Sequence, residues 1–175
     1  HIGSGASISA VKDGKRVNTS MGLTPNAGLV MGTRCGDIDA TILPYMVRKG
    51  FSIDELDTIM NKKSGFLGIS GKYSDGRDIL GGCSNGEERS ILARDMFVNR
   101  VVDYIAKYYF SMGGCDMIVF TAGMGEKSRP FRAEIMKRLS VIGIYLDEDA
   151  NEKCFGTEAK IISRSEERFS RNAET

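Results

Sequence analysis

The sequence predicts an α/β fold in which glycine-rich loops lie at the ends of strands. Three observations lead to this prediction. Residues 6–12 alternate in polarity and run into an Asp13-Gly14 turn, which is typical of a β-hairpin. Between a cap at residues 85–88 and the Gly113-Gly114 pair, apolar side chains recur at three- and four-residue steps, as in a long amphipathic helix. Residues 115–121 form a short apolar run, the pattern of a buried strand, and a glycine-rich segment and another helix follow it.

The hairpin is expected to return along Arg16 to Ser20. Residues 21–39 are rich in turn formers and show neither a helical nor a strand period, so we expect a long ordered loop. A helix is expected from about Ala40 to Arg48, in which Pro44 either lies in the first turn, where a missing N–H group does little harm, or kinks the helix.

Ser52 and Glu55 have the spacing of a capping box, which predicts a second helix to about Asn61. Residues 63–71 are a short apolar stretch interrupted by glycines, and residues 72–78 are expected to form a polar turn. Both of the first two helices look structural rather than functional.

The composition bounds the function. At 175 residues the chain has the size of one domain, or of one domain with a small appendage. With 27% charged residues and a net charge of +1, it has no broad electrostatic surface for nucleic acid or an anionic membrane, so any anion must be held locally. No apolar run approaches the roughly 18 residues of a membrane span, and no signal segment opens the chain.

The four cysteines show no C-x-x-C pairing and there is a single histidine, so neither a disulfide framework nor a zinc site is predicted. A reducing cytoplasm fits this pattern best. Glycine accounts for 21 residues, about 12%, against a usual value of about 7%, which suggests close approach of backbone to a ligand. Because His1 begins inside a glycine motif instead of at a methionine, we expect the chain to be a fragment.

The opening residues are the first candidate site. Gly3 and Gly5 lack the Cβ atoms that would keep an anionic oxygen from the backbone, so successive N–H groups can turn toward one phosphoryl group. His1 and Ser4 could add side-chain donors. Taken by itself, this short motif is more simply explained as an ordinary turn, because short Gly-x-Gly runs are common in turns.

Two further charged clusters are candidates. Arg34 and Asp37 stand between glycines, either as a surface ion pair or with the guanidinium presented to a phosphoryl or carboxylate group. Asp75 and Arg77 form either a solvated charge cluster or a grip on a ribose or adenine.

Residues 122–128 are the last candidate. They are expected to form a second glycine-rich loop, followed by a helix to about Leu139 with Pro130 in its first turn. A strand, a Gly-x-Gly loop and a helix suit an anion or nucleotide, because the helix N-terminus offers unpaired N–H groups. The segment lacks the third glycine of a dinucleotide fingerprint and the Gly-Lys-Ser/Thr of a P-loop. A short strand is possible at residues 160–163.

Four motifs together resemble the acetate kinase family, in the same order and with similar spacing. They are His1-Ile-Gly-Ser-Gly-Ala-Ser7, Thr24-Pro-x-x-Gly-Leu-x-Met-Gly-Thr-Arg34-x-Gly-Asp-Ile-Asp39, Ser70-Gly-x-x-Ser-Asp75-x-Arg77-Asp78 and Phe120-Thr-Ala-Gly-Met-Gly-Glu126-x-Ser128. The similarity spans the chain to about Asp147. Butyrate kinases are less similar in the second motif, whereas propionate kinases are too close to exclude.

The resemblance implies a ribonuclease H-like domain of the actin/hexokinase/Hsp70-like superfamily, with a mixed sheet flanked by helices. Residues 1–175 would be most of the second, nucleotide-binding domain, without the first domain and the extreme C-terminus. The implied activity is reversible phosphorylation of acetate by ATP with Mg²⁺, in a cytoplasmic homodimer that binds neither nucleic acid nor membrane. The metal ligands would lie outside this chain, and the chain alone would be inactive.

The resemblance also implies roles for particular residues. Arg34 would stabilise the transferring phosphoryl group. The phosphates of ATP or ADP would contact His1, Ile2, Gly3, Ser4 and Gly5. The adenosine end would be held by Asp75, Gly76 and Arg77. The nucleotide pocket would be lined by Gly123, Met124, Gly125, Glu126 and Lys127.

The chain departs from the family pattern at three places. Ser4 and Lys127 stand where asparagine is usual, and Ala40 replaces a usual proline. Ser4 still donates one hydrogen bond, and Lys127 exchanges a neutral amide for a mobile charge. A second hypothesis follows from these departures: a non-catalytic ATP-binding or sensing domain that has kept the nucleotide loops. A third is an unrelated glycine-rich α/β domain.

Overall fold

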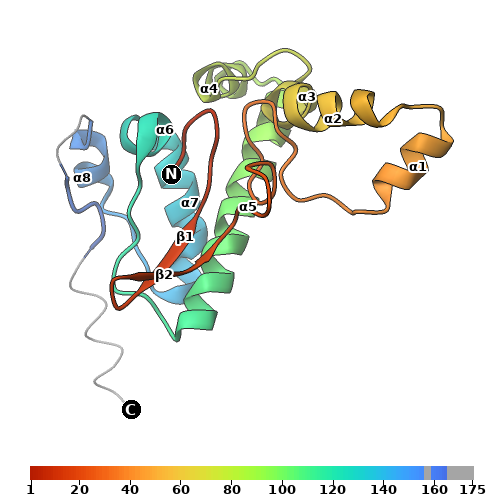
Figure 1. Cartoon of the computed structure of the whole chain (residues 1–175). Helices are drawn as coiled ribbons and strands as arrows, with labels where there is room; N and C mark the ends of the chain where they lie inside the picture. Colours follow the sequence, from red (N-terminus) through yellow and green to blue (C-terminus); the bar gives the residue numbers. More distant parts are fainter. Residues whose placement is uncertain (156–158, 165–175) are drawn as a thin grey trace. The chain divides into compact units, whose positions relative to one another are not determined.

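The computed structural model describes residues 1–155 and 159–164 (Figure 1). The chain divides into two compact units. The large unit holds residues 3–115, and the small unit holds residues 1–2 together with the chain from residue 116 onward. Within the described ranges, no helix combines the length and the apolar character needed to cross a membrane.

The predicted hairpin opens the large unit. Strands β1 (Ser9–Lys12) and β2 (Lys15–Thr19) pair antiparallel, with an irregularity between Ala10 and Val11. Asp13 and Gly14 between them have φ of 52° and 71°. Two successive positive φ values are those of a type I′ turn, whose twist matches that of the strands it joins. The hairpin is confirmed, and β1 begins three residues later than expected.

Helices α1 (Ile42–Arg48) and α2 (Ile53–Lys62) form an arm of the large unit (Figure 1). Pro44 lies in the first turn of α1, as predicted. Ser52 and Glu55 form the expected capping box: the Ser52 hydroxyl accepts from the Glu55 N–H at 3.2 Å, and the Glu55 carboxylate accepts from the Ser52 N–H at 2.8 Å. Local capping chemistry therefore placed α2 correctly.

Two helices were not predicted. α3 (Gly65–Ser70) replaces the interrupted apolar stretch, and α4 (Gly76–Ser84) begins inside the expected polar turn. Both pack on α5 (Glu88–Met112), whose contacts offset the low helix propensity of their glycines. Gly82 allows a close approach, because a Cβ there would overlap the Ser90 hydroxyl of α5. The expectation of a polar turn was thus wrong from Gly76 onward.

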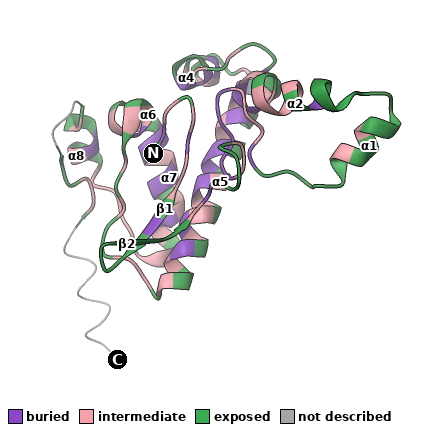
Figure 2. Cartoon of the chain, in the orientation of Figure 1, coloured by how far each residue is buried: buried purple, intermediate pink, exposed green. Residues whose placement is uncertain are grey.

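The predicted long helix is confirmed as α5, which ends at Gly113 in the left-handed conformation. One stripe along it is buried (Figure 2), and the helix packs against α3 and α4. At the α3 contact the rings of Phe66 and Phe97 lie 5.4 Å apart between centroids. The buried apolar positions of α5 are Ala93, Phe97, Val98, Val101, Ile105 and Tyr108.

The small unit is helical. It contains α6 (Ala122–Lys127), α7 (Arg129–Leu139), a 3₁₀ turn at Ser140–Ile142 and α8 (Glu148–Lys153). The predicted helix after Pro130 is confirmed as α7, and the expected glycine loop before it is a short helix. Helix α8 lies in the tail, where no helix was predicted.

The strand predicted at residues 115–121 is not formed. Met117 and Val119 are 75% and 60% exposed, no strand is assigned between α5 and α6, and the Ile2 N–H donates to the Thr121 carbonyl at 2.9 Å. An apolar run becomes a strand only where a partner strand satisfies its backbone groups. The predicted strand at 160–163 is likewise reduced to a single bridge between Leu146 and Ser163.

Candidate functional site

Arg34 lies in a loop of residues 28–36, the arginine loop, which is held by its backbone. The N–H groups of Phe66 and Leu67 at the start of α3 donate to the carbonyls of Met31 and Gly32, at 2.8 and 3.0 Å. The Ser64 N–H donates to the Thr33 carbonyl at 2.9 Å. The unpaired N–H groups that every helix start presents are therefore used here to fix the arginine loop.

The side chain of Arg34 is half-buried and is bonded at one nitrogen. Its Nη1 donates to the Pro25 carbonyl at 3.0 Å and lies 3.7 Å from the Met31 sulfur. A Cβ at Gly5 would lie 3.3 Å from the same nitrogen, so the opening glycine motif contacts the guanidinium. Within the described ranges Arg34 makes no ion pair with a carboxylate, which leaves its charge for another anion.

Asp37 does not pair with Arg34, so the ion-pair interpretation is wrong. Its carboxylate accepts from the Gly28 N–H at 2.8 Å and from the Tyr104 hydroxyl at 2.6 Å. Burial, together with the hydrogen bond to Asp37, raises the pKa of Tyr104 to about 12. Asp37 thus ties the arginine loop to α5.

Three predicted segments meet at Gly32. The Gly32 N–H donates to the Ser4 carbonyl at 3.1 Å, and a Cβ at Gly32 would lie 2.7 Å from the Ser74 carbonyl. The opening motif, the arginine loop and the segment preceding Asp75 are therefore side by side in the large unit. The Gly3 N–H is turned inward, to the Gly5 carbonyl at 3.1 Å.

Asp75 and Arg77 form the solvated charge pair that was one of the two alternatives. Asp75 caps α4 by accepting from the Arg77 N–H at 2.8 Å, and the Arg77 guanidinium reaches both carboxylate oxygens at 3.0 and 2.9 Å. These hydrogen bonds hold the pKa of Asp75 below its ordinary value. The Arg77 side chain is 87% exposed. Contact of this pair, and of Gly76 between them, with an adenosine stays a prediction.

In the small unit, residues 1–2 and α6 form one backbone network. The Ile2 carbonyl accepts from the N–H groups of Met124 and Gly125, at 2.9 and 3.2 Å. The Glu126 carboxylate caps the same helix by accepting from the Ala122 N–H at 2.9 Å. His1 Nδ1 lies 3.4 Å from the Thr121 hydroxyl. His1 and Ile2 are therefore held beside α6, although they are about 120 positions away along the chain.

The two remaining members of the predicted nucleotide segment face outward. Gly123 and Lys127 are exposed, and a Cβ at Gly123 would meet no atom within 4 Å. The space that a nucleotide would need beside Gly123 is thus open.

Sequence reasoning missed two anchoring residues. Arg132 is 1% exposed and bonds to α6 and α8, which its position on a helix rich in basic residues did not reveal. Glu87 accepts from Lys72 at 2.9 Å and from the Tyr73 hydroxyl at 3.3 Å, and so ties the turn before Asp75 to α5. Neither contact has a signal in the sequence, because the partners are far apart along the chain.

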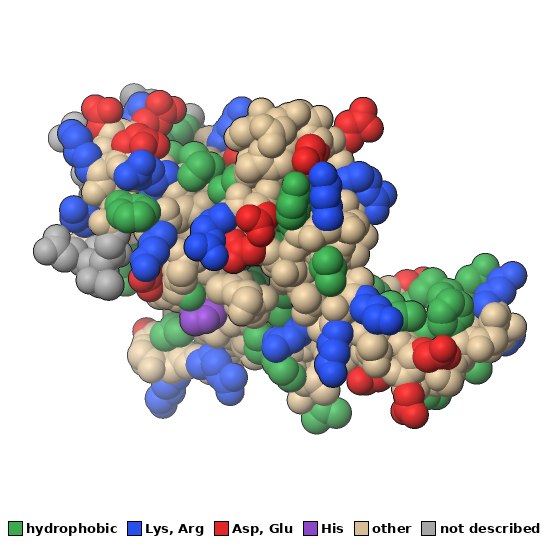
Figure 3. All heavy atoms as spheres, turned by 90° about the horizontal axis from the view of Figure 1, so that it is seen from above, with side chains coloured by type: hydrophobic (Ala, Val, Ile, Leu, Met, Phe, Trp, Pro, Cys, Tyr) green, Lys and Arg blue, Asp and Glu red, His purple; other side chains and the backbone are tan. Residues whose placement is uncertain are grey.

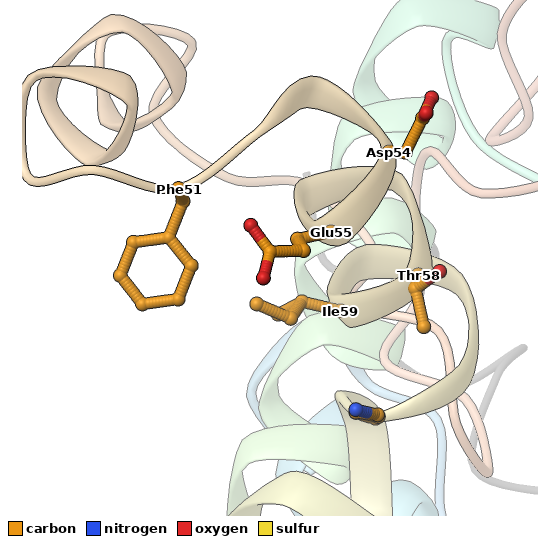
Figure 4. A pocket seen from close by; sticks show the side chains of 6 residues that line it. Phe51, Asp54, Glu55, Thr58 and Ile59 are labelled. Atoms are coloured by element: carbon orange, nitrogen blue, oxygen red, sulfur yellow. The ribbon is translucent and has the colours of Figure 1, made fainter.

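A hollow on the α1–α2 arm is separate from the predicted site residues. It is lined by Phe51, Asp54, Glu55, Thr58, Ile59 and Lys63. Figure 4 shows Glu55 and Ile59 pointing toward the side on which Phe51 lies, whereas Asp54 points away. Hydrophobic side chains also gather on this arm (right in Figure 3). The hollow is open and its carboxylates would repel a phosphate.

Similarity to solved structures shows the class of protein. A crystal structure of Porphyromonas gingivalis acetate kinase matches with a TM-score of 0.90 and 42% identity, over 96% of this chain and 42% of that one. A propionate kinase from Francisella tularensis matches with a TM-score of 0.89 and 38% identity, over 95% of this chain and 42% of that one. The fold is therefore that of the acetate and propionate kinases, within the actin/hexokinase/Hsp70-like superfamily.

The chain belongs to the acetokinase family, whose family model matches residues 1–172. It is 54% identical over 159 residues to an acetate kinase of Clostridium novyi, covering 90% of this chain and 40% of the relative. It is 47% identical to acetate kinase 2 of Aliivibrio fischeri, covering 95% of this chain and 42% of the relative. The resemblance seen in the four motifs is confirmed, and the chain spans about two fifths of the length of these relatives.

Proposed function

We propose that this chain is most of the second, nucleotide-binding domain of an enzyme that reversibly phosphorylates acetate with ATP. Membership of the acetokinase family supports the activity. The observation that carries the assignment of the site is the meeting of the opening motif, the arginine loop and the segment before Asp75 at Gly32. Three loops that the sequence marked separately are neighbours in the fold.

The chemistry of phosphoryl transfer suits these residues. The transferred group carries negative charge on its equatorial oxygens, so the protein must position it and neutralise it. Arg34, backed by the Gly5 backbone and without a carboxylate partner among the described residues, supplies the neutralising guanidinium. Gly5 and Ser4 supply an amide and a hydroxyl donor to the phosphates. His1 and Ile2, which are bonded to the segment of residues 121–125 in the small unit, are assigned to the phosphates by the family resemblance.

The nucleotide's adenosine end is assigned to Asp75, Gly76 and Arg77, and the pocket wall to residues 123–127. The exposure of Arg77 and the open space at Gly123 leave room for that ligand. The described residues contain no group of three or more His, Cys, Asp or Glu side chains that could hold a metal ion.

The family resemblance also supports a cytoplasmic homodimer that uses Mg²⁺ with ATP. A second candidate substrate is propionate, because the similar structure from Francisella tularensis is that of a propionate kinase. We assign no residue of this chain to the pocket that binds the acyl group.

The test is an acyl hydroxamate assay on the full-length protein with ATP, hydroxylamine and acetate, propionate or butyrate. We expect the highest kcat/KM with acetate. A higher value with propionate would move the assignment to propionate kinase. Nucleotide binding without hydroxamate from any acid would refute the kinase proposal and favour a non-catalytic ATP-binding domain.

A further inference from the structure

Arg132 is a buried cation whose hydrogen-bond acceptors among the described residues are all neutral oxygens. Its Nε donates to the Asn151 side-chain oxygen at 2.8 Å, and its Nη2 donates to the carbonyls of Asn151 and Cys154 at 3.2 and 2.8 Å. Its Nη1 donates to the carbonyls of Gly125 and Glu126 at 3.0 and 2.6 Å. One guanidinium therefore joins the last residues of α6 to α8.

Burying a cation among neutral oxygens is a costly way to stabilise a fold. Burial lowers the pKa of Arg132, which shows that its surroundings disfavour the charge. Well-packed apolar residues commonly stabilise an interior as well as a buried charge does, whereas a planar five-donor group fixes geometry. The arrangement is therefore better suited to placing α6 than to adding stability.

Helix α6 depends on such anchors. It has six residues, too few to be stable by its own hydrogen bonds. At its N-terminal side the N–H groups of Met124 and Gly125 hold the Ile2 carbonyl, and at its C-terminal side Arg132 holds the carbonyls of Gly125 and Glu126. Gly125 takes part in both contacts, so displacement of its carbonyl also displaces its amide and the Ile2 carbonyl bonded to it.

We propose that Arg132 is a positioning residue that holds α6 and, through Gly125, residues 1–2 in the geometry that nucleotide binding requires. The effect of Arg132 on nucleotide binding rests on the proposed function, in which α6 forms a wall of the nucleotide pocket. The structural half of the inference concerns the small unit alone and stands independently of the reaction.

The structural half is tested by hydrogen–deuterium exchange on the 175-residue chain. Arg132→Gln should speed exchange of the Met124 and Gly125 amides by on the order of tenfold or more, because their helix loses its C-terminal anchor. The matched control is Arg138→Ala on the same helix α7, where the guanidinium bonds to the carbonyl and carboxylate of Glu134, one turn away. The control should leave those amides protected.

Arg132→Lys is the second variant, because Arg132→Gln risks unfolding the small unit. Lysine keeps the charge, but one ammonium group cannot reach both α6 and α8, so the same local loss of protection is expected with unchanged helix content by circular dichroism. Unchanged protection of Met124 and Gly125 in a folded variant would overturn the proposal. Loss of protection throughout the small unit in both variants would also overturn it, by showing a general structural role.

The catalytic half is tested by steady-state kinetics on the full-length protein. Arg132→Lys should raise the KM for ATP by on the order of tenfold and change kcat by less than about threefold, while Arg138→Ala changes neither. An equal fall in kcat and kcat/KM with normal KM would contradict positioning of the nucleotide. If the unsubstituted protein forms no acyl phosphate, the proposed function fails, and the exchange result still decides whether Arg132 positions α6.

Discussion

At the scale of single residues, the backbone around Arg34 is fixed by hydrogen bonds, whereas most donors of its guanidinium group have no partner among the described residues. The arginine loop is bonded to α3 through main-chain groups, whereas of the three guanidinium nitrogens only Nη1 has a partner among the described residues. A side chain that stabilised the fold would be expected to use more of its donors. The local geometry therefore favours a ligand-binding role.

Under the proposed function, Arg34→Ala in the full-length protein should lower kcat by on the order of 10³ or more, with a smaller change in the KM for ATP. This pattern identifies a contact that is made mainly in the transition state. Arg48→Ala is the control, because Arg48 is exposed at the end of α1. An unchanged kcat for Arg34→Ala would remove Arg34 from the mechanism.

Gly123 offers a steric test of the nucleotide pocket. Because a Cβ at Gly123 meets no atom within 4 Å, Gly123→Val should fold without a clash and yet weaken nucleotide binding strongly. Titration with a fluorescent ATP analogue and thermal melting measure the two effects. Normal affinity in the valine variant would refute the placement of the pocket wall.

The Tyr104–Asp37 hydrogen bond predicts a dependence of stability on alkaline pH. The pKa of Tyr104 is about 12 in the folded chain, against about 10 for an unfolded tyrosine. Between pH 10 and 12 the folded state keeps a proton that the unfolded state has lost, so the free energy of unfolding falls as pH rises through that window. Below pH 10 the contribution is fully present.

Tyr104→Phe should therefore show a flatter pH dependence than the unsubstituted chain between pH 10 and 12. Urea unfolding at several pH values measures the difference, and Asp37→Asn should change it in the same direction. Parallel curves for all three proteins would contradict the assignment of the shifted pKa to this pair.

At the scale of elements, α3 is built to hold the arginine loop. Gly65 has φ of 61°, and a Cβ there would overlap the Met31 carbonyl and lie 2.8 Å from the Arg34 carbonyl. Only glycine permits this approach of the helix start to the loop.

Gly65→Ala should lower the free energy of unfolding by about 1–3 kcal/mol, because alanine is strained at this positive φ. It should also lower kcat, because the displaced start of α3 would move the loop that carries Arg34. Gly81→Ala in α4 is the matched control, since a Cβ there meets nothing within 4 Å. In a helix it should stabilise by about 0.5–1 kcal/mol. Equal stabilities for the two variants would show that the close approach at Gly65 is not required.

At the scale of the whole molecule, the chain covers about two fifths of the length of its acetate kinase relatives. Phosphoryl transfer requires both substrates to be held in line. The 175-residue chain alone should therefore form no acyl hydroxamate while binding nucleotide weakly. If this chain alone formed hydroxamate, it would be a complete catalytic unit, and the proposal that it is one domain of a larger enzyme would be wrong.

The sequence by itself determined the features that depend on neighbouring residues. The Asp13-Gly14 turn, the Ser52–Glu55 capping box and the glycine end of α5 each involve groups a few positions apart, so their chemistry can be read along the chain. The four motifs likewise determined the family, because their order and spacing are properties of the sequence.

Only the tertiary structure decided the features that depend on distant partners. Residues 115–121 have the composition of a strand but pair with no strand in the part of the chain that the structure describes, and α3 and α4 are helical where they pack on α5. The contacts of Gly32 with Ser4 and Ser74 join residues 28 and 42 positions apart, and those of Arg132 reach α6 and α8. Hydrogen bonds and burial between distant segments are settled by packing, which local patterns do not encode.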